Sequence, residues 1–222
     1  MNRKNNYLLI GAAVFCCGIM AVVDDIIQPG YALKSATKLG LFLLVPFLVS
    51  RLGDKLRFGR LFRFRRESIL PALGLGLGVY GLILGGYFLL RNRIDFSGIA
   101  DSLSSGAGVN KDNFLFVSLY ISFINSLLEE FFFRGFLFSN LKQSAGRAFA
   151  YGFSALMFSL YHIAMMIGWF HPAITLLLIL GLVAGGMIFN YLNEKQENIC
   201  TSWLVHMCAN FAINTIGFIL MA

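Results

Sequence analysis

The chain has 222 residues, of which 58% are hydrophobic and only 13% are charged. Soluble domains usually carry about 25% charged residues, so this composition excludes an ordinary water-soluble globular protein and indicates a membrane protein. The formal net charge of +7 is concentrated in one connection between apolar runs, which argues against nucleic acid as a partner.

Seven stretches are long and apolar enough to cross a bilayer, which takes about 20 residues. The first is interpreted as a retained span, because it ends in Val-Asp-Asp rather than in a cleavage site of small residues. The fifth and sixth are separated only by His171-Pro172, where we expect a tight turn. The predicted fold class is all-α, a polytopic transmembrane helix bundle of about seven spans. In chain order the predicted spans are 7–23, 32–50, 69–90, 114–138, 152–170, 173–192 and 203–221.

The connection between the second and third spans, 51–68, is strongly basic. A basic block between two apolar spans is typical of a cytoplasmic loop that contacts anionic lipid headgroups. With the N-terminus inside, twelve Lys/Arg fall on the inner side and five on the outer side, and the outer five include Lys34 and Lys38. This asymmetry predicts a cytoplasmic N-terminus. The basic residues of the loop are Arg51, Lys55, Arg57, Arg60, Arg63, Arg65 and Arg66.

Glycine is frequent in the third span, and Gly181-x-x-x-Gly185 occurs in the sixth. Small residues at close spacing let membrane helices approach one another. No strand-to-helix junction surrounds either group, as a phosphate-binding loop would require. We therefore expect these glycines to serve helix packing.

Ionisable side chains within the spans are few and gather in the C-terminal half. Of eleven Asp/Glu, only Glu129 and Glu130 lie in a strongly apolar stretch, and Arg134 follows them. His162 and His206 also lie within predicted spans. A charge in hydrocarbon is costly unless it is paired or hydrated, so such residues mark functional sites by default.

Helical periodicity sorts these residues onto faces. Glu130 and Arg134 are four residues apart, so they share a face and lie close enough to pair. Glu129 is turned about 100° away, which leaves it free to face another helix. An ion-pair network that only holds helices together explains the pair but not the other polar residues, so we favour a catalytic cluster. The same four-residue spacing relates Phe158 to His162 and His206 to Asn210.

Three motifs in this half resemble those of the CAAX-protease and bacteriocin-processing family, also called the CPBP or Abi family. They occur in the family's order over about residues 114–221, whereas the first three spans match only as generic hydrophobic helices. We therefore divide the chain into N-terminal transmembrane helices with the basic loop, 1–113, and a catalytic core of that family's type, 114–222. The motifs are Glu129-Glu130-Phe-Phe-Phe-Arg134, similar to Glu-Glu-x-x-x-Arg; Phe158-Ser-Leu-Tyr-His162, similar to Phe-x-x-x-His; and His206-Met-Cys-Ala-Asn210, similar to His-x-x-x-Asn.

The resemblance implies an intramembrane endopeptidase that hydrolyses a peptide bond of a membrane-associated or lipidated peptide or protein. In that mechanism Glu129 is the general base and His162 shares the activated water. His206 and Asn210 then donate hydrogen bonds to the oxyanion. The supporting residues would be Glu130, Arg134 and Phe158.

Metal dependence has two interpretations. Glu129, His162 and His206 form the set that could hold zinc, and the family has been described as metalloproteases. The chain lacks His-Glu-x-x-His, and Asn is an uncommon zinc ligand. We therefore favour a metal-free glutamate mechanism without a cofactor, with zinc as the alternative.

Two other classes of function would use the same residues. A proton-coupled transporter could run a relay through the cluster, but no internal hydropathy repeat accompanies it. A non-catalytic membrane scaffold or immunity protein could keep the motifs for stability. The protease remains the favoured class, with a peptide or protein substrate in the membrane, no nucleic acid and no indication of an oligomeric state. The absence of Asn-x-Ser/Thr fits a bacterial plasma membrane.

Overall fold

The computed structural model describes residues 3–52, 61–63, 65–101 and 108–221. Every regular element in these ranges is a helix. Seven of the helices are long and apolar enough to cross a membrane. The predicted all-α polytopic bundle is therefore confirmed, and so is the number of spans. The spanning helices are Asn5–Ile27, Tyr31–Leu52, Arg66–Leu90, Phe114–Ser144, Arg147–Met166, Pro172–Gln196 and Cys200–Met221.

Most spans are single α-helices, but the first and fourth contain π-helical segments. The first span joins α1 (Arg3–Ala21) to η1 (Val22–Ile27). The fourth joins α5 (Phe114–Tyr120), η3 (Ile121–Asn125), α6 (Ser126–Glu129), η4 (Glu130–Phe138) and α7 (Ser139–Ser144). The remaining helices are α2 (Tyr31–Leu52), α3 (Arg66–Leu90), the short α4 (Ser97–Asp101), α8 (Arg147–Met166), α9 (Pro172–Gln196) and α10 (Cys200–Met221).

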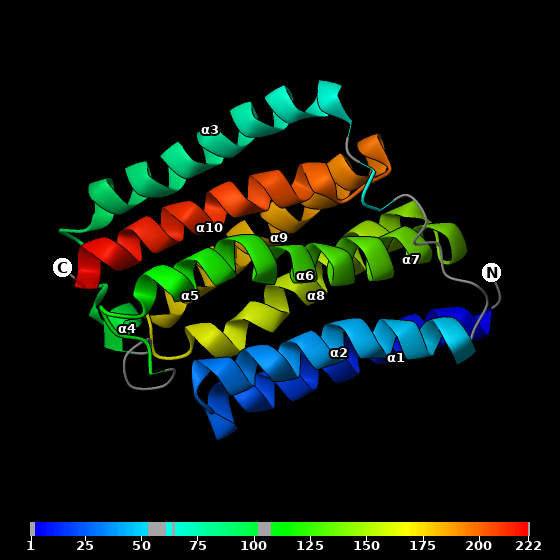
Figure 1. Ribbon diagram of the computed structural model, residues 1–222, viewed down its shortest axis with the longest axis horizontal. Coiled ribbons are helices and arrows are strands. Elements are labelled where there is room, and N and C mark those ends of the chain that lie inside the picture. The colour runs from blue at the N-terminus through cyan, green and yellow to red at the C-terminus, as the bar shows by residue number, and fades with distance from the viewer. Residues whose placement is uncertain (1–2, 53–60, 64, 102–107, 222) are drawn as a thin grey trace.

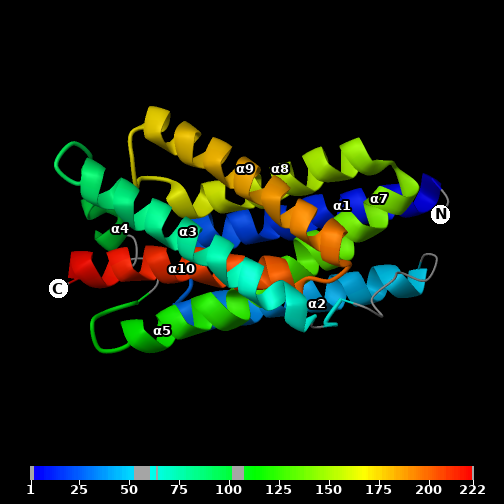
Figure 2. The ribbon, with the colours of Figure 1, turned by 90° about the horizontal axis from the view of Figure 1, so that it is seen from above.

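Successive spans run in opposite directions, so the connections alternate between the two ends of the bundle. In Figure 1, α1 and α2 lie together along one edge, α3 lies along the opposite edge against α10, and the fourth span runs between them. α8 packs against α1 and α9. Figure 2 shows the same alternation from above, with the two termini at opposite ends. One end of the bundle therefore contains the start of α1, the end of α2, the start of α3, and the α7–α8 and α9–α10 connections.

The fourth span is the centre of the bundle and is longer than predicted. Its helix continues past Phe138 to Ser144, because the polar stretch that begins at Ser139 remains helical. A helix that is apolar all round belongs in a protein interior. In agreement, Phe132, Phe133 and Phe136 are fully buried.

The predicted boundaries of the fifth span were wrong. α8 begins at Arg147, after Gly146 in a left-handed conformation with φ +95°, and ends at Met166. His171-Pro172 is not a tight turn but the start of α9. There His171 is the N-cap, and its Nδ1 accepts a bond from the Ala173 backbone N–H at 3.4 Å. Proline favours the first position of a helix because its missing N–H has no partner there.

Gly76 and Gly186 are among the glycines that mark close contacts. A Cβ at Gly76 of α3 would lie 2.6 Å from the Cys208 Sγ of α10, and one at Gly186 of α9 would lie 3.0 Å from the Ala155 Cα of α8. Gly181 and Gly185 would have nothing within 4 Å of an added Cβ. Packing through the predicted Gly181-x-x-x-Gly185 motif is therefore wrong, and the neighbouring Gly186 makes the contact.

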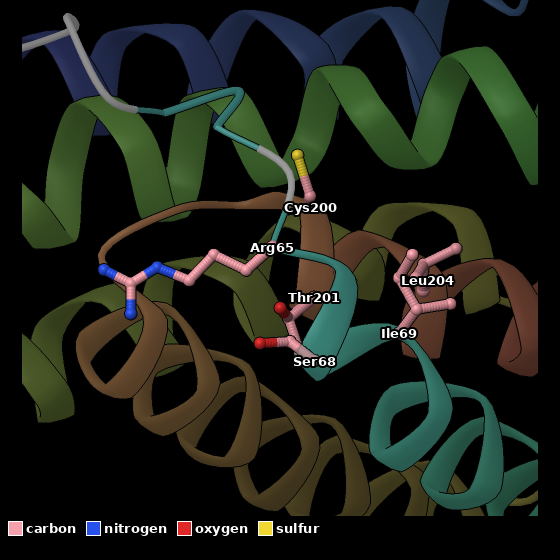
Figure 3. Close-up of a pocket in the computed structure, with 6 residues that line it drawn as sticks. All are labelled: Arg65, Ser68, Ile69, Cys200, Thr201 and Leu204. Carbon is pink, nitrogen blue, oxygen red and sulfur yellow. The ribbon is translucent and has the colours of Figure 1, made fainter.

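The end of the basic segment is attached to the α9–α10 connection. The Ile199 backbone N–H donates to the Leu61 carbonyl at 2.9 Å, and the Ser68 hydroxyl bonds to Gln196 Oε1 at 2.7 Å. Figure 3 shows the residues that line the small pocket that results: Ser68 lies beside Thr201 and Ile69 beside Leu204, and Arg65 and Cys200 complete the lining. Of the predicted basic residues, Arg51, Arg63 and Arg66 are exposed, Arg65 is half-buried, and Lys55, Arg57 and Arg60 lie outside the described residues.

Candidate active site

Glu129 lies at the centre of the bundle, where α6 meets the π-helical η4. It is fifteen residues before Ser144, and His162 is fifteen residues after Arg147 on the antiparallel α8. At about 1.5 Å of rise per residue, both side chains lie about 22 Å from the end that α7 and α8 share. The two residues are therefore at the same depth.

Three helices direct polar side chains to this point. Glu129 Oε2 lies 3.8 Å from His162 Nε2 and 3.6 Å from His206 Nε2. Glu129 is 1% exposed and His206 is 5% exposed, while the His162 side chain keeps 16% of its surface accessible. The structure thus brings together the predicted general base and both predicted histidines.

The other ring nitrogen of each histidine is occupied. His162 Nδ1 lies 2.6 Å from the Phe158 carbonyl oxygen, and His206 Nδ1 lies 3.0 Å from Glu130 Oε1. Because both partners can only accept, each Nδ1 must donate. This assigns the tautomer of the neutral rings and leaves each Nε2 lone pair directed at the space beside Glu129.

Glu129 faces other helices as predicted, and it has partners besides the two histidines. Its Oε1 lies 2.5 Å from Lys38 Nζ and accepts a second bond from Asn125 Nδ2 at 3.0 Å. Lys38 Nζ also donates to Asn125 Oδ1 at 2.5 Å. A lysine on a neighbouring helix and an amide one turn earlier on the same helix therefore hold one carboxylate oxygen.

Lys38 was assigned wrongly to an outer connection. It belongs to α2, is 4% exposed, and has its ammonium 4.8 Å from the centre of the Tyr161 ring. Long charged side chains can bury their stems while the head group finds a polar partner. Its removal from the outer count leaves four Lys/Arg there against twelve, so the predicted asymmetry becomes larger.

The expected Glu130–Arg134 pair is present and fully buried, with Nη1 3.2 Å from Oε1. The guanidinium also lies 4.2 Å from the centre of the Phe158 ring and 4.9 Å from that of Phe189. Phe158 in turn meets the His162 ring edge-on at 4.7 Å. Phe158 therefore separates the arginine from the imidazole and packs against both.

Asn210 of α10 contacts the backbone of the fourth span. Its Nδ2 donates to the Ile121 carbonyl at 3.2 Å, an oxygen that also accepts the Ser126 backbone N–H at the end of the π-helical η3. Among the described residues this is its one recorded hydrogen bond. It lies one turn along α10 from His206, and the structure records no direct bond between Asn210 and Glu129.

Sequence reasoning missed three residues of this site: Lys38, Asn125 and Phe189. Asn125 is four residues before Glu129, so helical spacing alone could have placed it on the same face. Lys38 lies inside an apolar run, where a lysine needs a partner. Phe189 stacks on the His206 ring with centroids 5.1 Å apart, and nothing in its local sequence distinguishes it from other buried phenylalanines.

One member of the predicted zinc set, Glu129, already pairs with a lysine. Within the described ranges no group of three His, Cys, Asp or Glu side chains is arranged to hold a metal ion. In addition, a zinc ligand is a deprotonated donor facing the ion, whereas the Lys38 ammonium lies against Glu129.

The fold and the site together define a polytopic α-helical membrane protein with a buried glutamate–histidine cluster. Residues 111–212 match the family model described as Rce1-like, type II CAAX prenyl endopeptidase Rce1-like. This match contains all three motifs and confirms the resemblance to the CAAX-protease family, so it supports a CAAX-type intramembrane endopeptidase. Searches of curated proteins and of solved structures found no match.

Proposed function

We propose that the chain hydrolyses a peptide bond of a membrane-associated or lipidated substrate, with a water activated by Glu129 and His162. The observation that carries the proposal is the convergence of Glu129 Oε2 with the Nε2 atoms of His162 and His206, at 3.8 and 3.6 Å. These separations exceed a direct hydrogen bond and suit one bridging water. The family match supports the same class of reaction.

In the proposed reaction Glu129 Oε2 removes a proton from the water while the water oxygen bonds to the scissile carbonyl carbon. The carbonyl oxygen becomes an oxyanion, and His206 donates to it through Nε2–H in the form of the ring that carries a second proton besides the Nδ1–H held by Glu130. Glu129 then delivers its proton to the amide nitrogen as the C–N bond breaks. Asn210 supplies a second donor in this proposal, since its Nδ2 carries two hydrogens and the Ile121 carbonyl uses one.

We propose that Glu130, Arg134 and Phe158 orient this site. Glu130 holds His206 through Nδ1, and Arg134 holds Glu130. An imidazole with one nitrogen fixed by a carboxylate directs the other nitrogen at its target. The three residues therefore act through the histidines rather than on the substrate.

We propose that the reaction needs no metal. The support is that the Lys38 ammonium lies against Glu129 and that no group of three His, Cys, Asp or Glu side chains among the described residues is arranged to hold an ion. The rate should then be unchanged after dialysis against a strong chelator and after addition of zinc. A rate that falls with the chelator and returns with zinc would overturn this part.

We further propose that the N-terminus is cytoplasmic, in a bacterial plasma membrane. The ends of α2 and α3 that flank the basic segment share one end of the bundle with the α7–α8 and α9–α10 connections (Figure 1), as the predicted charge asymmetry requires. The exposed Arg51, Arg63 and Arg66 would then contact anionic lipid headgroups.

The test compares Glu129→Gln with Glu194→Gln in the purified protein reconstituted in lipid. Glu194 binds Arg147 at 3.0 Å at the bundle end, so the second variant makes the same chemical change outside the site. With a farnesylated fluorogenic CAAX peptide, Glu129→Gln should lower kcat by about 100-fold or more, whereas Glu194→Gln should keep wild-type activity. Equal rates for Glu129→Gln and wild type would refute the mechanism. A wild-type protein with no cleavage of this or other membrane peptides would favour the scaffold.

A further inference from the structure

Among the described residues, Lys38 is the one cation of α2 that lies at the buried cluster. It contacts Glu129, which is the general base in the proposed function. It lies outside the family match, which begins at residue 111. We propose that Lys38 is a positioning residue for Glu129: it holds Oε1 so that Oε2 faces the two imidazoles. This inference rests on the proposed function and adds a residue to it.

The first support is that the two carboxylate oxygens of Glu129 have different partners. Oε1 receives Lys38 Nζ at 2.5 Å and Asn125 Nδ2 at 3.0 Å, and Oε2 faces the histidines. The terminal torsion of a glutamate is broad and poorly fixed by its own rotamer preferences. Two donors from different directions on one oxygen fix the carboxylate plane and therefore the direction of the other oxygen.

The fixed position of the lysine itself is the second support. Its ammonium donates to Asn125 Oδ1 and lies 4.8 Å from the Tyr161 ring centre and 5.5 Å from that of Phe42. A lysine side chain normally loses rotamer entropy when it is held in one place. Here two aromatic rings and an amide fix the ammonium before any substrate is present, which a group that only cancels charge would not require.

The matched control is one helical turn away. Lys34 of α2 pairs with Asp24 at 2.6 Å, and the Asp24 side chain is fully buried. Lys34→Met and Lys38→Met therefore each remove one positive charge from the same helix and each leave a buried carboxylate without its lysine. Only Lys38 touches Glu129.

Activity per folded molecule distinguishes positioning from stability. Lys38→Met should lower kcat by about 100-fold, as expected for a reacting group displaced by about 1 Å, with KM changed less than about 3-fold. Lys34→Met should leave both constants within about 3-fold of wild type. If Lys38→Met also has wild-type kcat per folded molecule, the inference is overturned.

A double variant tests whether Lys38 acts through Glu129. In Glu129→Asp the shorter carboxylate is already withdrawn from the ammonium, so adding Lys38→Met should cost less than about 3-fold more. A full multiplicative loss in that background would show an independent role and overturn the inference. If Glu129→Gln retains wild-type kcat, the proposed function fails instead, so the two failures are distinguishable.

Asn125→Leu covers the case in which Lys38→Met does not fold. It removes the second donor to Oε1 and the oxygen that holds the ammonium, but it leaves the lysine charge beside Glu129. We expect kcat to fall by about 10-fold with KM nearly unchanged. An unchanged kcat in this variant would also overturn the positioning role.

Discussion

The Glu130–Arg134 pair gives a stability prediction that does not depend on catalysis. Both side chains are fully buried, 3.2 Å apart, and the guanidinium lies over the Phe158 ring. Arg134→Met keeps an unbranched side chain but removes the charge. Glu130 would then remain as a buried carboxylate whose one recorded polar partner among the described residues is His206.

The expected magnitude follows from the burial. Removing one partner of a buried ion pair costs about 3–5 kcal/mol, because the remaining charge stays desolvated. The lost cation–π contact is part of this cost and contributes up to about 2 kcal/mol when it is desolvated. For a chain of this size about 1 kcal/mol corresponds to about 2–4 °C in Tm, so Arg134→Met should lower Tm by about 6–20 °C.

The assay is thermal unfolding in one detergent, followed by tryptophan fluorescence, for the wild type, Arg134→Met, Glu130→Gln and the double variant. The double variant removes both charges, so it should recover at least half of the Tm lost in Arg134→Met. A Tm loss below about 2 °C in Arg134→Met would refute the assigned role of the ion pair. A double variant that loses the sum of the two single effects would refute the coupling.

Two further predictions concern packing and the bundle end. Gly76→Leu should destabilise the fold by about 1–3 kcal/mol through overpacking, because a Cβ there meets Cys208 Sγ at 2.6 Å. Membrane accumulation and Tm should therefore both fall. Gly78→Leu, where a Cβ has nothing within 4 Å, is the control, and an equal loss in both would contradict the packing role. Glu194→Gln should change the free energy of unfolding by less than about 1 kcal/mol, since its partner Arg147 is 68% exposed; a larger Tm shift would contradict this.

The spans and the motif contacts were predictable because both depend on local periodicity. Hydropathy located seven helices, and the four-residue spacing of Glu130 and Arg134 predicted their contact. The end of the fourth span was not predictable from hydropathy, because polar residues after Phe138 continue the same helix. The boundary error in α8 has the same origin, since Arg147 begins a helix whose first turn is not the most apolar part.

Lys38 shows what periodicity could not provide. Its contact with Glu129 joins positions 91 residues apart, and it depends on which face of α2 meets the fourth span. Sequence spacing fixes relations within one helix, whereas this relation is set by packing between two. The same limit applies to Asn210. Its position one turn from His206 was predictable, but its contact with the Ile121 carbonyl of another helix was not.

The region around the π-helical η3 determines how the fourth span tolerates the deletion of a residue near Glu129. Side chains of α10 bond to three backbone oxygens of this region: Trp203 to Phe123, Asn210 to Ile121 and Asn214 to Ser118, at 3.1, 3.2 and 3.1 Å. These bonds prevent this part of the fourth span from rotating about its own axis. A one-residue deletion in α6, between positions 126 and 128, would therefore swing Glu129 by about 100°, away from both imidazoles, while the hydropathy profile and every motif letter stayed intact.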